Sequence, residues 1–188
     1  AVKAIYAFMK GETSDLKIYE MEHPDVLLWA VWTIQQFAKE VSRKDAFEKY
    51  GQLLKDIMDY LVSGKHPNLQ VRENGLVYSE GRNTWMNATV NGRPVTPRTG
   101  YIVEFNTLWY NALRFVGELL GENGDAEFSA RLTEVADKAG KAFVETFLNE
   151  YGYLLDYVAD GNMMDWSVRP NMIFAAAFDY SPLDANTK

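Results

Sequence analysis

Cysteine is absent from the 188-residue sequence, which excludes disulfide bonds and thiolate metal sites. Histidine is scarce: His23 and His66 lie too far apart for a metal-ligand motif, so we expect no metal ion and no other cofactor. Runs of lysine or arginine are also missing, and 26 acidic residues outnumber 19 basic ones. A net charge of −7 without a basic cluster argues against nucleic acid and against an anionic membrane surface as partners.

Long apolar runs are missing too, so no stretch of the sequence can cross a bilayer. The N-terminal residues lack the layout of a signal peptide, and with the absence of cysteine this favours a cytoplasmic protein. Aromatic residues, by contrast, are plentiful at 14% of the chain. Large rings fill protein cores, but the flat C–H faces of sugars also stack on aromatic rings. The composition is therefore compatible with a carbohydrate ligand.

Apolar residues recur at helical spacing in five segments. The pattern predicts helices over about residues 24–41, 45–62, 103–120, 126–149 and 170–178. An Asn74-Gly75 pair between Val71 and Val77 predicts a two-residue β-hairpin turn. The segment before residue 24 is too weakly periodic for an assignment.

The order of these elements predicts an all-α fold with a small β-hairpin and long loops. Helices in pairs, joined by loops that alternate between short and elaborate, are typical of an α-solenoid or an α/α toroid, and no βαβ rhythm is present. Close sequence repeats of the TPR or HEAT kind are absent. A long irregular stretch, about residues 81–99, is expected to be functional because compact domains rarely keep such loops as simple connections.

Three segments at or before helix N-termini carry candidate site residues. The first contains Asp25 and Trp29, which are four residues apart and so share one helix face. A carboxylate there can accept hydrogen bonds from sugar hydroxyls, and an indole can cover a sugar face. The plainer alternative is that Asp25 only complements the helix dipole while Trp29 belongs to the core.

The second segment, residues 83–111, joins a loop to the helix that follows it and contains Trp85, Arg98 and Glu104. Such a concentration of Trp, Arg, Asn and Pro is unusual for a simple connection. The alternative for Arg98 and Glu104 is a surface ion pair, which would contribute little to stability.

The third segment, residues 163–171, places Asp165, Trp166 and Arg169 ahead of a short apolar helix. A structural Asp–Arg pair beneath the helix start is the alternative to a binding role. The two interpretations of this segment are compatible, because one guanidinium can pair with Asp165 and also bind a ligand.

These segments resemble the glycogen-debranching family of the amylo-α-1,6-glucosidase type. The family signature TWMDA, followed by PVTPR, V-E-I/F-N and LWYNAL, is similar to TWMNATVNGRPVTPRTGYIVEFNTLWYNAL here. The later D-x-S-x-R-P-N stretch of the family is similar to MDWSVRPNMIFAAAF, and its early D-x-x-L-W is matched by residues 25–29. The three matches follow the family order and cover most of the chain after residue 24.

The resemblance implies an (α/α)6 barrel that hydrolyses the α-1,6-linked glucose at a glycogen branch. The chemistry is inverting: a carboxylic acid protonates the leaving oxygen while a carboxylate base activates water on the opposite face. We expect residues 1–188 to be a single fragment, about half of this barrel, with the later helices and the general base beyond residue 188. The expected partners are α-glucans (glycogen, limit dextrin and maltooligosaccharides), and exposed inner faces of an open barrel favour self-association.

By this resemblance the general acid belongs at Asn87, where the family has Asp. An amide cannot donate an acidic proton, and general acid catalysis typically contributes about 10²–10⁴-fold, so we expect this fragment to be inactive. The native protein is then a non-hydrolytic relative, or carries a substitution that traps substrate, or uses Glu104 as the acid. The last explanation ranks lowest, because Glu104 matches a family Glu that accompanies the usual Asp.

The resemblance and the three segments together give the substrate-binding residues that we expect: Asp25, Trp29, Trp85, Arg98, Asp165, Trp166 and Arg169.

Besides a debranching hydrolase, two other functions fit the sequence. One is an α-glucan-binding pseudoenzyme that keeps the pocket without hydrolysis. The other is an α/α-toroid enzyme for another sugar linkage or a helical interaction scaffold, although a scaffold would not require the chemistry of the second segment.

Overall fold

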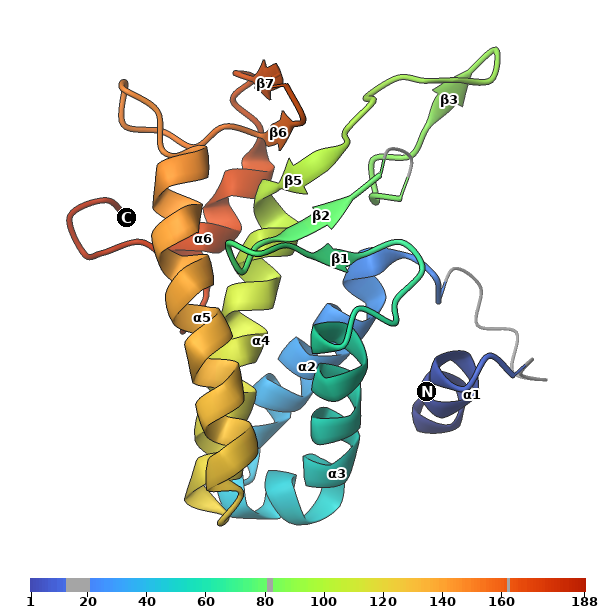
Figure 1. The fold of residues 1–188 in the computed structure, drawn as a ribbon, viewed down its shortest axis with the longest axis vertical. Helices are drawn as coiled ribbons and strands as arrows, with labels where there is room; N and C mark the ends of the chain where they lie inside the picture. Colours follow the sequence, from blue (N-terminus) through green and yellow to red (C-terminus); the bar gives the residue numbers. More distant parts are fainter. Residues whose placement is uncertain (13–20, 81–82, 162) are drawn as a thin grey trace.

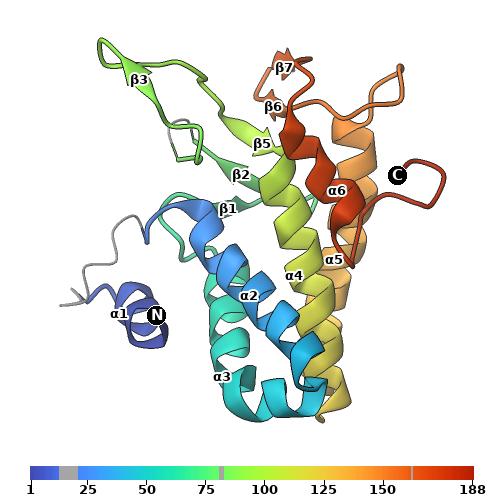
Figure 2. The same cartoon turned by 180° about the vertical axis from the view of Figure 1, so that it is seen from behind.

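Helices form most of the molecule in the computed structural model, which describes residues 1–12, 21–80, 83–161 and 163–188. Within these ranges the α-helices are α1 (Val2–Met9), α2 (Pro24–Glu40), α3 (Arg43–Val62), α4 (Val103–Glu122), α5 (Ala126–Phe147) and α6 (Ile173–Ala177). A 3₁₀ turn, Pro170–Met172, leads into α6. Helices α2, α4 and α6 begin at one end of the molecule and run away from it, while α3 and α5 run back (Figure 1, Figure 2).

A small antiparallel sheet lies across the end where α2 and α4 begin (Figure 1). Its strands, in the order β1-β2-β5-β6-β7, are β1 (Gln70–Val71), β2 (Val77–Ser79), β5 (Gly100–Ile102), β6 (Tyr157–Ala159) and β7 (Met163–Asp165). A separate hairpin of β3 (Thr89–Val90) and β4 (Arg93–Pro94) projects from the same end. Strand β5 runs directly into α4, so the sheet and the central helix are one continuous segment.

Local chemistry fixes where the long helices begin. Pro24 occupies the first turn of α2, where its missing N–H costs nothing. The Ser42 hydroxyl caps α3 by accepting a hydrogen bond from the Asp45 amide at 3.0 Å. The Asp125 carboxylate does the same for α5, accepting from the Phe128 amide at 3.3 Å. These caps hold the short connections that turn each helix back along its partner.

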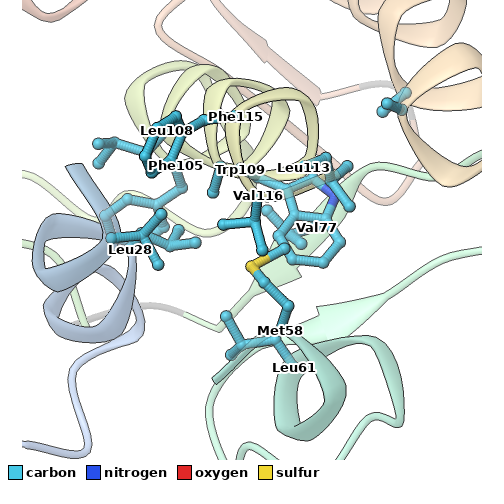
Figure 3. Packing of buried hydrophobic residues seen from close by; sticks show 14 of the residues in the cluster. Leu28, Met58, Leu61, Val77, Phe105, Leu108, Trp109, Leu113, Phe115 and Val116 are labelled. Carbon is cyan, nitrogen blue, oxygen red and sulfur yellow. The ribbon is translucent and has the colours of Figure 1, made fainter. Parts of the chain in front are cut away.

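Helix α4 is the centre of the core and is buried along almost its whole length. Figure 3 shows its apolar side chains meeting those of α2, α3 and the sheet. Trp109 is completely buried, and its indole Nε1 donates to the Gly75 carbonyl oxygen at 2.9 Å, which ties α4 to the hairpin turn. Gln35 of α2 and Asn111 of α4 exchange amide hydrogen bonds of 3.2 and 2.6 Å. Both amides are buried, so this exchange fixes the register of the two parallel helices.

The structure confirms the predicted helices α2, α3, α4 and α5 within a few residues and adds α1, for which the sequence offered no assignment. Helix α1 packs against α3, where the Tyr6 hydroxyl donates to the Asp56 carboxylate at 3.0 Å. The predicted hairpin is present as β1 and β2, but its turn is not the expected two-residue one: residues 72–76 join the strands, with Gly75 at a φ of 83°. The fifth helix is shorter than expected, because its first turn is the 3₁₀ segment.

Two expectations need correction. The all-α prediction is too narrow: helices make up 54% of the structure, but β5, β6 and β7 extend the hairpin into a five-stranded sheet. Strands of two or three residues are too short to show an alternating pattern in the sequence. The stretch 81–99, of which residues 81 and 82 lie outside the described part, contains the ordered hairpin β3–β4, whose turn places Asn91 and Gly92 at φ values of 52° and 74°.

The lengths and directions of the helices bear on membrane insertion and on the predicted barrel. Across the described ranges, no helix is long and apolar enough to traverse a membrane. The alternation of α2, α4 and α6 with α3 and α5 is the order that an α/α toroid requires, but closure of a barrel stays a prediction.

Candidate functional site

A buried ion network lies where the sheet meets the start of α4. Its centre is Arg98, which is completely buried in the segment just before β5. The guanidinium binds both oxygens of Glu104, with Nη1–Oε1 and Nη2–Oε2 distances of 2.5 Å each. Glu104 stands in the first turn of α4, where a carboxylate also complements the helix dipole. The Arg98–Glu104 pair is therefore an interior contact that joins the loop to the helix, not the surface pair that the sequence left open.

Asp156 is the second carboxylate of the network and comes from the segment that enters β6. Arg98 Nε donates to Asp156 Oδ2 at 2.7 Å, and Arg98 Nη2 donates to Oδ1 at 3.0 Å. The main chain of Asp156 takes part as well, because its carbonyl oxygen accepts from the Val103 amide at 3.1 Å at the start of α4. Asp156 thus fastens β6, the loop before β5 and α4 to one another.

Arg169 carries the network from the interior to the surface. Its Nη1 donates to Asp156 Oδ2 at 2.7 Å and lies 3.1 Å from Asp165 Oδ1. Asp165 is in turn fixed by the Ser167 amide, which donates to the same oxygen at 2.8 Å. The Arg169 side chain is 22% exposed, so a residue anchored on two carboxylates is still partly accessible to solvent.

Asn171 connects this network to the loop that contains the expected acid position. With its carboxamide oxygen facing the guanidinium, Asn171 accepts from Arg98 Nη1 at 3.2 Å and Nη2 at 3.1 Å. The carboxamide atom in that position also lies 3.5 Å from the sulfur of Met86, which is a packing contact. Met86 is also held from its own loop, because its amide donates to the Thr84 hydroxyl at 3.1 Å. The neighbouring Asn87 is exposed, one residue away from this anchor.

The network holds three carboxylates against two guanidiniums in a largely dry environment. Burial raises the pKa of Glu104, and Arg98 opposes this rise. Burial alone would lower the pKa of Arg98, but its bonds to Glu104 and its attraction to Asp156 raise it further above its ordinary value. Burial likewise opposes ionisation of Asp165, yet hydrogen bonds from Ser167 and Arg169 outweigh it and hold the pKa of Asp165 below its usual range. Burial and polar contacts therefore act in opposite directions on the pKa values of Glu104, Arg98 and Asp165.

Asp25 and Trp29 of α2 lie at the same end of the molecule as the ion network but in different surroundings. Asp25 is buried, and Trp29 Nε1 donates to its Oδ2 at 3.3 Å. The Trp29 ring packs edge-on against Phe174 and Phe178, with centroid distances of 5.6 and 6.2 Å. Trp29 thus joins α2 to the α6 segment as part of a half-buried aromatic cluster, and it still orients the Asp25 carboxylate.

Two predicted site residues lie outside the bonded network. Trp85 is 58% exposed in the loop beside Asn87. Trp166 is 43% exposed and has its ring against Tyr151, at a centroid distance of 6.2 Å. The structure therefore brings Arg98, Glu104, Asp165 and Arg169 into one bonded cluster, while both tryptophans are exposed. Across the described residues, no group of His, Cys, Asp and Glu side chains is arranged to hold a metal ion.

Most of the chain matches one known protein family. A sequence model of the family described as amylo-alpha-1,6-glucosidase matches residues 17–188. The chain belongs to the amylo-alpha-1,6-glucosidase family. A comparison with curated proteins finds no significant match. The match includes all the segments that build the ion network, and it associates the chain with glycosidases of glycogen debranching.

Within this amylo-alpha-1,6-glucosidase chain, sequence reasoning missed Asp156. The residue stands in the extended piece YGYLLDYV, between two leucines and a Tyr-Val pair. An acidic residue inside an apolar strand is rarely buried without a cationic partner. That signal would have indicated a partner for Arg98 or Arg169, although the sequence alone does not show which arginine reaches it.

Proposed function

We propose that this chain forms one wall of the active site of a glycoside hydrolase that removes α-1,6-linked glucose from glycogen-like α-glucans. The observation that carries the proposal is the Arg98–Glu104–Asp156–Arg169 network. It fixes a guanidinium at the end where the parallel helices begin, next to the loop that contains the family acid position. Enzymes hold substrate-contacting groups in this way, with their donors oriented by buried partners before the substrate arrives.

The exposure and bonding of the residues support the roles that we propose for them. Arg169, whose side chain is partly exposed, binds hydroxyl groups of the terminal glucose. Asp25, oriented by Trp29, accepts from sugar hydroxyls on the opposite side. Arg98 and Glu104 are buried and satisfied by each other, so they shape the site through Arg169 and Asp156. In an inverting mechanism the residue at position 87 protonates the leaving oxygen while a base activates water.

The proposal extends to the whole barrel. Helices α2, α4 and α6 correspond to inner helices and α3 and α5 to outer helices of an (α/α)6 barrel. A complete barrel of this kind needs further helices and a general base in addition to these elements. Support comes from the family match and from the alternation of helix directions.

Calorimetric titration with maltooligosaccharides tests the binding role of Arg169. The Arg169→Ala variant is expected to bind about 10–100-fold more weakly, since hydrogen bonds to a charged group contribute about 1.5–3 kcal/mol. Arg93→Ala, which removes an exposed arginine of the β3–β4 hairpin, is the matched control and should bind like the unchanged chain. Equal affinities for all three proteins, each with an unchanged helical circular dichroism spectrum, would remove the basis for the proposal.

Asn87 favours a second candidate, a glucan-binding protein without hydrolysis. An amide at the acid position leaves every hydrogen-bonding contact of the network intact and removes only the proton donor. A protein of this kind retains maltooligosaccharide affinity while releasing no glucose. The two candidates differ in whether activity returns with the Asn87→Asp substitution.

A further inference from the structure

A rigid turn between α5 and β6 presents two tyrosines beside Trp166. Tyr151 is 72% exposed, which is a high exposure for a residue with a large aromatic ring. The rings of Tyr151 and Tyr153 lie almost parallel, 17° apart with centroids 6.4 Å from each other. Trp166 meets Tyr151 at 67° and 6.2 Å. We call these three residues the aromatic corner.

The aromatic corner is held by its backbone. The Asn149 side-chain oxygen accepts from the amides of Tyr151 at 2.9 Å and Tyr153 at 3.3 Å. Asn149 and Tyr153 also pair through their main chains, with the Asn149 amide donating at 3.0 Å, and Gly152 supplies the required positive φ of 81°. Because the turn is fixed before any ligand binds, the rings lose little conformational freedom on binding.

The aromatic corner is continuous with the ion network. Trp166 directly follows Asp165, which binds Arg169, and the Ser167 amide that orients Asp165 belongs to the same short segment. The turn after α5 and strand β7 lie at the same end of the molecule in both ribbon views (Figure 1, Figure 2). A ligand that occupies the network end therefore reaches the aromatic corner without crossing the molecule.

From this geometry we propose that the aromatic corner binds the main chain of an α-1,4-glucan while the branch glucose occupies the site at Arg169. The inference rests on the proposed function. The exposed rings of Tyr151 and Trp166 lie at a steep angle, so the apolar faces of successive glucose units can pack against one ring each. The exposed Glu150 and Ser167 beside them supply acceptors and a hydroxyl for the sugar rim, which an apolar protein interface does not need.

The test compares oligosaccharides of different length on the same chain by calorimetry. Tyr151→Ala and Trp166→Ala are expected to weaken maltoheptaose binding about tenfold each, as loss of one aromatic contact implies, and Tyr151→Ala is expected to leave maltose binding unchanged. Tyr151→Phe keeps the ring and should retain maltoheptaose affinity. Val41→Ala, which removes an exposed apolar side chain at the C-terminal end of α2, should behave like the unchanged chain.

The outcomes separate this inference from the proposed function. If the unchanged chain binds maltoheptaose and the alanine variants bind it equally well, the aromatic corner is not a glucan site, and the proposed function stands. If the unchanged chain is folded and binds no oligosaccharide, both proposals fail together. If the alanine variants instead abolish self-association in sedimentation experiments without changing maltoheptaose affinity, the surface belongs to a second copy of the chain and the inference is overturned.

Discussion

Removing the charge of Arg98 tests the energetic role of the ion network. Arg98→Met keeps most of the side-chain volume but leaves Glu104 without its two 2.5 Å hydrogen bonds and Asp156 without those of 2.7 and 3.0 Å. Asp156 keeps Arg169, whereas Glu104 becomes a buried carboxylate with no cation. Breaking one partner from a buried pair costs about 3–5 kcal/mol. Domains are stable by only about 5–15 kcal/mol, so the loss should be large in urea unfolding.

The pH dependence of this variant makes the test sharper. Burial already raises the pKa of Glu104 against the opposition of Arg98, so without Arg98 that pKa rises further above its unfolded value. A carboxyl of this kind destabilises the fold only when ionised, and the loss is therefore present at high pH and recovered as pH falls through the raised pKa. Arg98→Met should be more destabilised at pH 8 than at pH 5, and adding Glu104→Gln should restore part of the loss at pH 8. Unchanged stability, or a loss equal at both pH values, would refute this reasoning.

Three further predictions concern single contacts. Gly100→Ala should lower the melting temperature strongly, because φ is +100° and a Cβ there would lie 2.3 Å from the Val158 carbonyl oxygen. Gly92→Ala, where φ is +74° and the space around the Cβ is open, should lower the free energy of unfolding by only about 1–2 kcal/mol. Burial lowers the pKa of His66 to about 4, so its contribution to the free energy of unfolding is complete above pH 6.5 and falls by about 3 kcal/mol as pH drops towards 4. His66→Gln should reduce the pH dependence measured by urea unfolding in this window by that amount, and an unchanged pH dependence would contradict the assignment. Asp156→Asn should lower the free energy of unfolding by about 3–5 kcal/mol, since it removes the carboxylate that two arginines share, and an unchanged urea midpoint would exclude that role.

The long helices could be predicted from the sequence because their signals are local. Apolar spacing shows helices such as α4, a Ser or Asp cap marks the start of α3 and α5, and Asn74-Gly75 marks the first hairpin. The strands β5 to β7 could not be predicted in the same way. They contain three residues each. Strands β5 and β6 pair although they lie far apart in the sequence, as Tyr101 and Val158 show, and β7 pairs with the neighbouring β6.

The site was predictable only in part for a related physical reason. Family motifs indicated Arg98, Glu104, Asp165 and Arg169, and the structure places them in one cluster. Which carboxylate binds which guanidinium depends on tertiary contacts, and Asp156, the residue that joins both arginines, carries no local signal beyond its apolar neighbours. The roles of Asn87 and the tryptophans in substrate binding remain predictions that only ligand experiments test.

Glucose release from a phosphorylase-limit dextrin tests the central claim most directly. The comparison uses the protein extended through the complete barrel, once with Asn87 and once as the Asn87→Asp variant. The account predicts release that rises by about 10²–10⁴-fold with the substitution, which is the contribution of a general acid. Equal release from both proteins would move the acid elsewhere, with Glu104 the next residue to substitute. No release from either protein, with maltooligosaccharide binding intact, would contradict the hydrolase and leave the glucan-binding protein.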